Sequence, residues 1–216
     1  MALAPELRLF SFIIVISAML SAILLAAGSS RRMGSVNKLL LPWQDNTVVF
    51  ATAQNLLAAG IEDLIVVTGH DPEAVTAALA TLPARTVHNP AHATGMTSSI
   101  QTGVRIARGK GYMICLADMV LITPVEYTLL KTAFLRQHLL DDQCIVLPVY
   151  QGEQGNPVIF SSWYRNALLQ HPETEGCKTL VRDHADHHLR VAMPADHVLR
   201  DIDRPEQYTD LIHRST

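Results

Sequence analysis

The sequence predicts a single α/β domain with a doubly wound, mostly parallel sheet and helices on both faces. Unbroken apolar runs at residues 21–25, 64–68 and 111–117, which suit buried parallel strands, alternate with segments of helical periodicity. No internal repeat or linker interrupts this alternation, and 216 residues are enough for one domain with a substantial core. Because ligands of such sheets bind beyond the carboxyl ends of the strands, the residues after each strand are the first site candidates.

Strands and helices alternate through the first two thirds of the chain. The strands are expected at residues 21–25, 64–68, 85–88 and 111–117. Each expected helix opens on residues that can accept hydrogen bonds from its first turn, namely Thr47, Asp71, Ser98 with Ser99, and Thr123. Thr123 and Glu126 also have the spacing of a capping box, in which the two side chains each bond the other's backbone N–H.

The last third of the chain is less regular. Strands are expected at residues 144–150 and 156–160, with a glycine-bearing turn between them, followed by two helical stretches divided by Gly176. Residues 189–193 and 198–203 are predicted to form closing strands, and Pro205 to begin a terminal helix.

The composition limits the classes of partner and compartment. A net charge of -3 and a pI of about 6.3 argue against a nucleic-acid-binding surface, which is normally basic. The three cysteines, Cys115, Cys144 and Cys177, lack Cys-x-x-Cys spacing, and we expect buried free thiols in a reducing, cytoplasmic compartment. The sequence itself does not indicate an oligomer, and we expect a monomer.

The beginning of the chain is apolar enough to suggest a membrane anchor. Residues 9–27 are interrupted only by three serines. However, the end of this run is needed as the first strand, and a strand in the core cannot also lie in lipid. We therefore expect the folded domain at residues 19–216, with residues 1–18 as an extension outside the fold; a membrane anchor is the alternative.

The loop after the first strand has the composition of a phosphate-binding site. Leu25 is the last large residue before the loop. The small residues that follow let the backbone approach a ligand closely, and these are Ala26, Ala27, Gly28, Ser29 and Ser30. Arg32 and Lys38 add two cations. The Walker and dinucleotide-binding patterns are excluded, because Gly34 is followed by Ser35 rather than Lys and the glycines are too far apart. We expect a nucleoside triphosphate here.

Residues 25–34, Leu-Ala-Ala-Gly-Ser-Ser-Arg-Arg-Met-Gly, with Lys38 shortly after, resemble the signature of the MobA-like nucleotidyltransferases. The double alanine is similar to the molybdenum cofactor cytidylyltransferase branch of that family. The resemblance implies a Rossmann-like fold of the nucleotide-diphospho-sugar transferase type. It also implies transfer of CMP from CTP to the terminal phosphate of molybdopterin, or of the molybdenum cofactor, for delivery to a recipient molybdoenzyme.

Two acidic positions are candidates for a divalent cation, Mg²⁺ or Mn²⁺. Asp118 ends an apolar strand, so its carboxylate projects from the sheet edge where phosphates are expected. By resemblance to the family's Asp-Met-Pro and Asp-x-Asp-Thr-Pro-Glu motifs, Asp118 and Asp203 are the metal ligands, although Val120 and Arg204 depart from those motifs. Asp201 is expected to point the same way as Asp203. The alternative is that both metal candidates only cap the following turns.

Further family-like segments supply candidates for the nucleotide and the acceptor. Gly95, Ser98 and Ser99 lie in a Gly-Met-x-x-Ser-Ile motif, where a helix start can bind base or ribose. The remaining nucleotide candidates follow strands, and are Thr68, Gly69 and Asn89, the last placed to read an exocyclic group. By resemblance to a Gly-x-x-Gly-His-Pro segment, the acceptor candidates are Gly152, Gly155, Asn156 and Pro157.

The expected reaction depends on positioning and charge more than on acids and bases. Backbone N–H groups of residues 27–30 and Arg32 are expected to bind the β and γ phosphates, and Lys38 to stabilise charge at the α-phosphate, with Asp118 as the third catalytic residue. GTP as donor, and a sugar phosphate, alditol phosphate or phospholactate as acceptor, are alternatives, as is an inactive cofactor-binding module. We discount His184, His187 and His188 as a zinc site and expect a solvated helix face.

Overall fold

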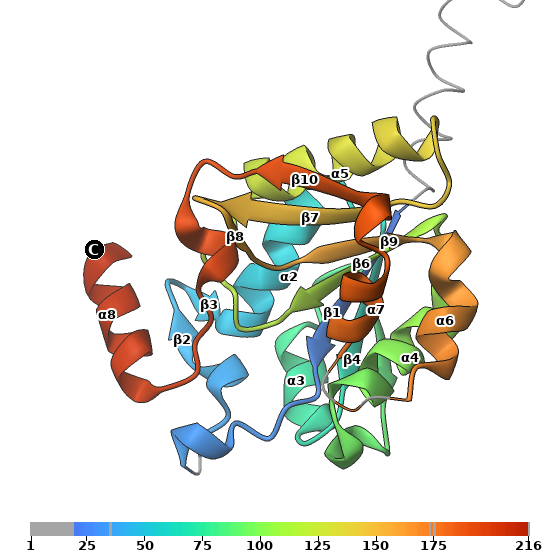
Figure 1. The fold of residues 1–216 in the computed structure, drawn as a ribbon. Coiled ribbons are helices and arrows are strands. Elements are labelled where there is room, and N and C mark those ends of the chain that lie inside the picture. Colours follow the sequence, from blue (N-terminus) through green and yellow to red (C-terminus); the bar gives the residue numbers. More distant parts are fainter. Residues whose placement is uncertain (1–19, 35, 173, 175, 216) are drawn as a thin grey trace, which may run out of the picture.

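The computed structural model describes residues 20–34, 36–172, 174 and 176–215, which contain an eight-stranded mixed sheet (Figure 1). Its strand order is β10-β7-β9-β6-β1-β4-β5, with β8 paired to β7. The strands are β1 (Leu20–Ala26), β4 (Asp63–Thr68), β5 (Arg85–His88), β6 (Gly111–Leu116), β7 (Ile145–Tyr150), β8 (Glu153–Gln154), β9 (Val158–Ser161) and β10 (His188–Ala192). On the main path only β9 is antiparallel to its neighbours, so the predicted fold class is confirmed.

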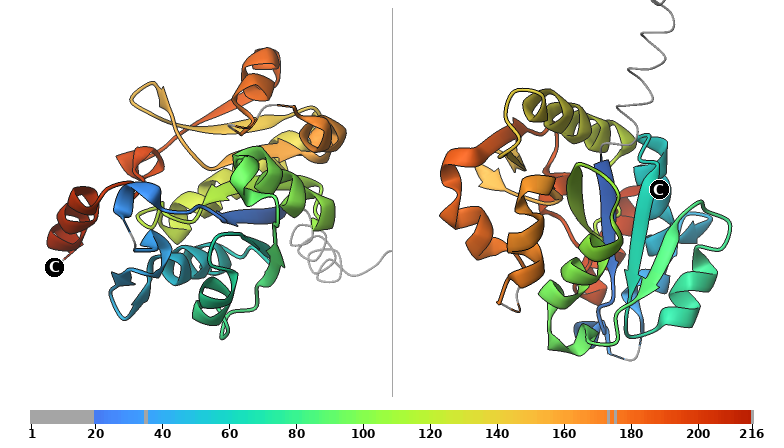
Figure 2. Two further views of the ribbon diagram at one scale, coloured as in Figure 1. Left: turned by 90° about the horizontal axis from the view of Figure 1, so that it is seen from below. Right: turned by 90° about the vertical axis from the view of Figure 1, so that its right-hand side faces the viewer.

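Helices cover both faces of this sheet (Figure 2). One buried cluster contains residues of α2 (Val48–Ala58), α3 (Pro72–Ala78) and α5 (Pro124–His138). The cluster on the opposite face contains residues of α4 (Met96–Ile106), α6 (Arg165–Gln170) and α7 (Lys178–Asp183). Successive β1 residues alternate between the two clusters, as the period of a strand requires, so β1 is buried on both sides.

A small hairpin and the last helix form a third packing unit at the side of the molecule (Figure 1). The hairpin pairs β2 (Pro42–Trp43) with β3 (Asn46–Thr47), and the Tyr208 hydroxyl of α8 (Pro205–Ser215) donates to the Pro42 carbonyl at 2.6 Å. Ile202, just before α8, is buried in the same cluster as Trp43 and Val120. This unit therefore fixes the chain that leads into α8.

The first residues of the helices test the predicted capping residues. The predicted caps at Thr47 and Thr123 are confirmed, because Thr47 Oγ1 accepts from Phe50 N and the Thr123–Glu126 box is complete. α3 begins at Pro72 as predicted, but the Asp71 carboxylate makes no cap bond and accepts from the Asn37 amide at 3.4 Å. α4 begins at Met96, ahead of the serines predicted to open it.

Two other predictions are wrong. Residues 198–203 do not form a strand: a 3-10 turn at Asp196–Leu199 leads into an irregular segment. Backbone groups of residues 198–203 bond to two segments that are distant in sequence. Val198 O accepts from Asn156 N at 2.9 Å, and Ile202 N donates to Asp118 O at 3.2 Å. The three histidines do not share a helix face either, since α7 ends at Asp183, before all three. His187 bonds the Tyr164 hydroxyl instead of solvent.

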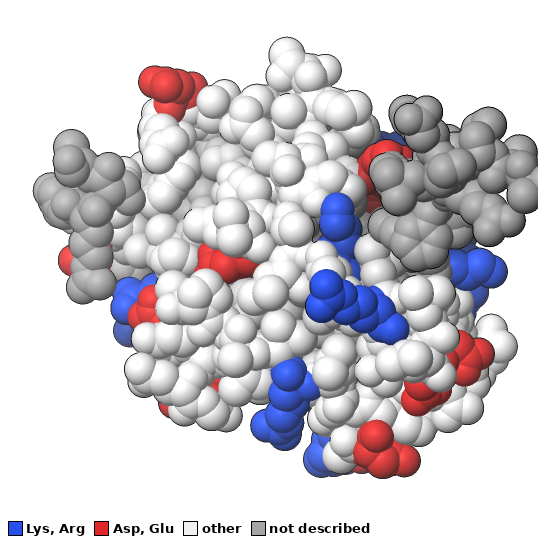
Figure 3. All heavy atoms as spheres, turned by 90° about the horizontal axis from the view of Figure 1, so that it is seen from above, with Lys and Arg blue, Asp and Glu red and all other residues white. Residues whose placement is uncertain are grey.

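Cys115, Cys144 and Cys177 are buried, and none of the three forms a disulfide, as predicted. Residues 1–18, expected to lie outside the fold, and Met19, the first residue of the expected domain, lie outside the described residues. Across the described part of the chain, no helix is both long enough and apolar enough to cross a membrane. On the face drawn in Figure 3, basic and acidic side chains are scattered among uncharged ones.

Asp63 joins β1, β4 and β5 at the amino end of the sheet. Its carboxylate accepts from the Ser21 hydroxyl, from Arg108 N at 3.1 Å and from Arg85 Nε at 3.1 Å. Burial raises the pKa of Asp63, but these hydrogen bonds and the Arg85 charge outweigh it, so this pKa lies below its ordinary value of 3.8. The native state therefore binds the Asp63 proton less tightly than the unfolded state does.

This shifted pKa predicts a pH-dependent effect of Asp63→Asn on stability. Above pH 4 the lost charged hydrogen bonds should lower the free energy of unfolding by about 2 kcal/mol. The wild-type advantage should shrink as the pH falls below the ordinary value of 3.8, because the wild-type carboxyl then also becomes protonated. Urea unfolding at pH 7 and pH 3 measures this, with Glu62→Gln as the control for an exposed neighbouring carboxylate. An equal loss at both pH values would contradict the assignment.

Candidate functional site

The loop between β1 and residue 38 brings the predicted phosphate-binding residues to the carboxyl end of the sheet. Ser30 adopts a left-handed backbone conformation with φ 48°, and its hydroxyl accepts from Lys38 N at 3.2 Å. Ala27 O accepts from His70 N at 3.3 Å. Gly69 is required at this contact, since a Cβ there would lie 2.7 Å from the Ala27 carbonyl oxygen. The residues that follow β4 thus pack directly against the loop.

Lys38 lies at the centre of a charged cluster. Its Nζ contacts Asp118 Oδ2 and lies 2.9 Å from Asp203 Oδ1, and its side chain is only 14% exposed. Burial lowers the pKa of Lys38, but Asp118 and Asp203 outweigh it, so the pKa lies above its ordinary value and the amine is charged. Arg32 pairs with the other oxygen of Asp203. The two predicted cations therefore meet the two predicted metal ligands.

A third carboxylate, Asp201, belongs to the same cluster. Asp118, Asp201 and Asp203 each offer an oxygen, and these oxygens all lie within 4.8 Å of one another. Burial first, then the charges of Asp118 and Asp203, raise the pKa of Asp201 above its ordinary value. Three carboxylates thus face two cations. An all-oxygen set with excess negative charge fits a hard divalent cation such as Mg²⁺ or Mn²⁺.

The fold explains how residues so distant in sequence meet. Asp118 follows β6, and its carbonyl accepts from the Ile202 N–H. Because Ile202 is buried beside Val120, its neighbours Asp201 and Asp203 are directed to the cluster. The predicted metal pair did not include Asp201, although its spacing from Asp203 was a usable signal.

A cavity of about 1100 Å³ extends from this cluster across the carboxyl ends of β1 and β4 to the start of α4. It exceeds the usual range for small-molecule sites, so it has room for a nucleoside triphosphate. The predicted residues that line it are Leu25, Ala27, Gly28, Ser29, Ser30, Arg32, Lys38, Gly95, Ser99, Asp118 and Asp203. His70, His92 and Lys178 also line it. None of these three belongs to a motif used above, although His70 directly follows the predicted strand-end Gly69.

Five predicted nucleotide residues are not among those that line the cavity, namely Ala26, Thr68, Gly69, Asn89 and Ser98. Asn89 is only 2% exposed: its amide donates to Ser98 Oγ at 2.8 Å and Ser99 Oγ at 3.0 Å, and its oxygen accepts from Ala91 N. In this structure Asn89 therefore positions the start of α4, which presents Ser99 to the cavity. Direct reading of a base by Asn89 remains a prediction.

The predicted acceptor residues, Gly152, Gly155, Asn156 and Pro157, do not line this cavity. Asn156 N donates to Val198 O, and a Cβ on Gly155 would lie 2.2 Å from the same oxygen. This strand-end region thus packs closely against the segment that carries Asp201 and Asp203. In this structure it supports the carboxylates from outside the cavity.

A phosphate-type loop, a buried lysine and a carboxylate cluster at the edge of a mostly parallel sheet define a nucleotide-binding α/β protein. Residues 22–189 match the MobA-like NTP transferase domain, and the chain belongs to this nucleotidyltransferase family.

The chain is similar to several known proteins. It is 26% identical to the molybdenum cofactor cytidylyltransferase of Escherichia coli over 91% of this chain and 97% of that protein. It is 34% identical to the nicotine blue oxidoreductase of Paenarthrobacter nicotinovorans, over 44% of this chain and 46% of that protein. Among solved structures, a nucleotidyl transferase from Methanothermobacter superimposes with a TM-score of 0.80 at 25% identity, covering 92% of this chain and 99% of that one.

Proposed function

We propose that this protein is a cytidylyltransferase that uses a divalent cation, Mg²⁺ or Mn²⁺, to transfer CMP from CTP to the terminal phosphate of molybdopterin or of the molybdenum cofactor, releasing pyrophosphate. The observation that carries the proposal is the position of Lys38, whose ammonium lies between Asp118 and Asp203 at the end of the glycine-containing loop. The similarity to the Escherichia coli enzyme over nearly its whole length supports this choice of donor and acceptor.

The loop and its cations would bind the triphosphate. Backbone N–H groups of residues 27–30 provide donors without charge, as phosphate loops do. Arg32 is 68% exposed and pairs with Asp203, so its guanidinium is free to exchange that carboxylate for β- and γ-phosphate oxygens. Lys38 is more buried and remains beside Asp118, where its charge stabilises negative charge developing around the α-phosphate.

The carboxylates would hold the cation. Asp118, Asp203 and Asp201 supply oxygen ligands, and the bound cation would neutralise phosphate oxygens during displacement. Burial and then the charges of Asp118 and Asp203 raise the pKa of Asp201, and the cation would offset these charges. No side chain has to act as a general base, because the attacking phosphate of the acceptor is already ionised at neutral pH. The residues act by positioning and by charge neutralisation.

A direct assay tests this function. Purified protein is incubated with Mg²⁺, molybdopterin and either CTP or GTP; pyrophosphate is measured and the product is identified by mass. We expect pyrophosphate and a pterin cytosine dinucleotide with CTP, and little product with GTP. Parallel reactions with an alditol phosphate and with phospholactate should give none. Preference for GTP or for another acceptor would overturn the proposal, and no release with any acceptor would favour an inactive cofactor-binding module.

A further inference from the structure

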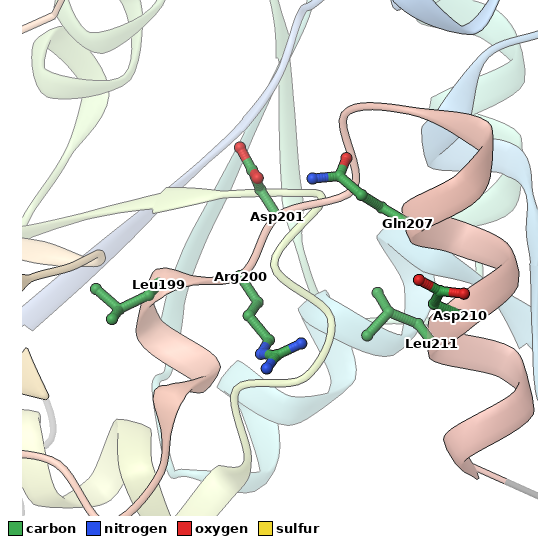
Figure 4. A pocket seen from close by; sticks show the side chains of 6 residues that line it. All are labelled: Leu199, Arg200, Asp201, Gln207, Asp210 and Leu211. Atoms are coloured by element: carbon green, nitrogen blue, oxygen red, sulfur yellow. The ribbon is translucent and has the colours of Figure 1, made fainter.

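A second pocket, of about 150 Å³, adjoins the carboxylate cluster between the irregular segment and α8 (Figure 4). Its lining consists of Leu199, Arg200, Asp201, Gln207, Asp210 and Leu211. Asp201 lines both this pocket and the large cavity. No residue of the loop at 27–38 is among the described residues that line the small pocket. It therefore reaches the cluster by a route separate from the loop.

Gln207, an exposed residue of α8, lines this pocket and is held by two hydrogen bonds. Its amide oxygen accepts from Asp203 N and from Arg204 N, both at 2.8 Å. These two bonds orient the amide, and its nitrogen points toward Asp201 (Figure 4). The pocket thus has an oriented neutral donor next to the carboxylates expected to hold the cation.

We propose that this pocket is the subsite for the acceptor and takes a neutral, N–H-bearing ring of that molecule; the inference rests on the proposed function. In phosphoryl-type displacement the attacking and leaving oxygens lie roughly in line with the phosphorus. If the loop holds the leaving pyrophosphate, the acceptor phosphate must approach the α-phosphorus from the side away from the loop. The small pocket reaches Asp201 without any loop residue, as this geometry requires.

The charges of the lining select the kind of acceptor. Arg200 is already paired with Asp196, its Nε lying 2.7 Å from Asp196 Oδ2, which leaves Asp201 and Asp210 as acceptor groups of the wall. Two carboxylates disfavour an acceptor that carries its own carboxylate, such as phospholactate. They favour adjacent N–H donors, and the 2-amino-4-oxo edge of a pterin offers an amino and a ring N–H to one carboxylate. A volume of about 150 Å³ corresponds to one six-membered ring, so the pocket would hold the ring that carries the amino group and leave the rest of the pterin outside it.

Asp210→Asn tests the subsite, because it keeps the shape of the side chain and removes its charge. Glu206→Gln is the matched control: it removes one charge from the same helix at an exposed residue that does not line the pocket. The probe is 6-hydroxymethylpterin, titrated by its fluorescence. We expect Asp210→Asn to weaken pterin binding about tenfold, and Glu206→Gln to leave it unchanged. The KM for molybdopterin should rise similarly in Asp210→Asn, with the KM for CTP unaffected.

The outcomes separate this inference from the proposed function. Turnover of CTP and molybdopterin by the wild type, with Asp210→Asn behaving like Glu206→Gln, would overturn the subsite and leave the function standing. Turnover with another acceptor only would overturn the function. In that case, pterin binding that is lost in Asp210→Asn would still support the pocket, and absence of saturable pterin binding by the wild type would reject it.

Discussion

Lys38→Ala is expected to lower kcat for pyrophosphate release by about 10²–10³-fold, the usual effect of removing one oriented charge from a transition-state site. The Lys38 ammonium is the group that contacts Asp118 and Asp203 together, and both carboxylates hold its pKa high. The side chain is not part of a buried apolar cluster, so the fold should persist, with unchanged circular dichroism. Rates at saturating CTP and acceptor measure the effect directly.

Two further variants sharpen this test. Lys110→Ala removes an exposed lysine at the start of β6, the opposite end of that strand from Asp118, and should leave kcat unchanged. Lys38→Arg keeps the charge but replaces a compact ammonium with a planar fork, so we expect partial activity. Near-native kcat in Lys38→Ala would show that the cluster is structural and does not stabilise the reacting phosphate.

The central strands could be predicted from sequence because each is buried on both faces. Continuous apolar runs placed β1, β4 and β6 within a residue at each end. The strand at 85–88 was also predicted with its exact bounds, although it is only half-buried. The phosphate loop could also be predicted, since its residues are consecutive and their positions relative to β1 follow from the sequence alone. Most of them do line the cavity.

Residues 198–203 show why the rest was not predictable. Val198 and Leu199 are apolar, and Ile202 lies between two aspartates, which favours a short, half-buried strand. In the structure, Ile202 is buried in the cluster that contains Trp43 and Val120, and the Val198 carbonyl accepts from the backbone N–H of Asn156. These partners come from distant parts of the chain, and the pattern contains no information about them.

The same limit applies to individual site residues. Asn89 was correctly placed at a strand end, but whether its amide faces a ligand depends on Ser98 and Ser99, which take up its donors. Lys178 lines the cavity because Thr97 of α4 bonds the segment just before α7, through Thr174 O and Gly176 O, and no motif marks it. Motifs therefore identify the loop, the carboxylates and the start of α4, whereas the position of Lys178 depends on tertiary packing.

Asp118→Asn is expected to lower kcat by about 10²–10³-fold and to weaken Mn²⁺ binding by the isolated protein. Asparagine keeps the size and one oxygen of aspartate but removes the charge that contacts Lys38 and neutralises a divalent cation. Asp118 is also one of the two carboxylates whose charges raise the pKa of Asp201, so its loss should bring that pKa closer to the ordinary value. Pyrophosphate release measures the fall in kcat, and Mn²⁺ titration by electron paramagnetic resonance measures the loss of Mn²⁺ affinity.

Asp45→Asn serves as the control, because Asp45 is an exposed aspartate in the β2–β3 turn and does not line the cavity. It should leave both kcat and Mn²⁺ binding unchanged. If Asp118→Asn lost activity but bound Mn²⁺ as the wild type does, Asp118 would act through Lys38 rather than as a metal ligand. If it kept both properties, the carboxylates would be a structural ion-pair network. Only a joint loss of turnover and Mn²⁺ affinity is consistent with Asp118 holding the cation opposite the phosphate loop.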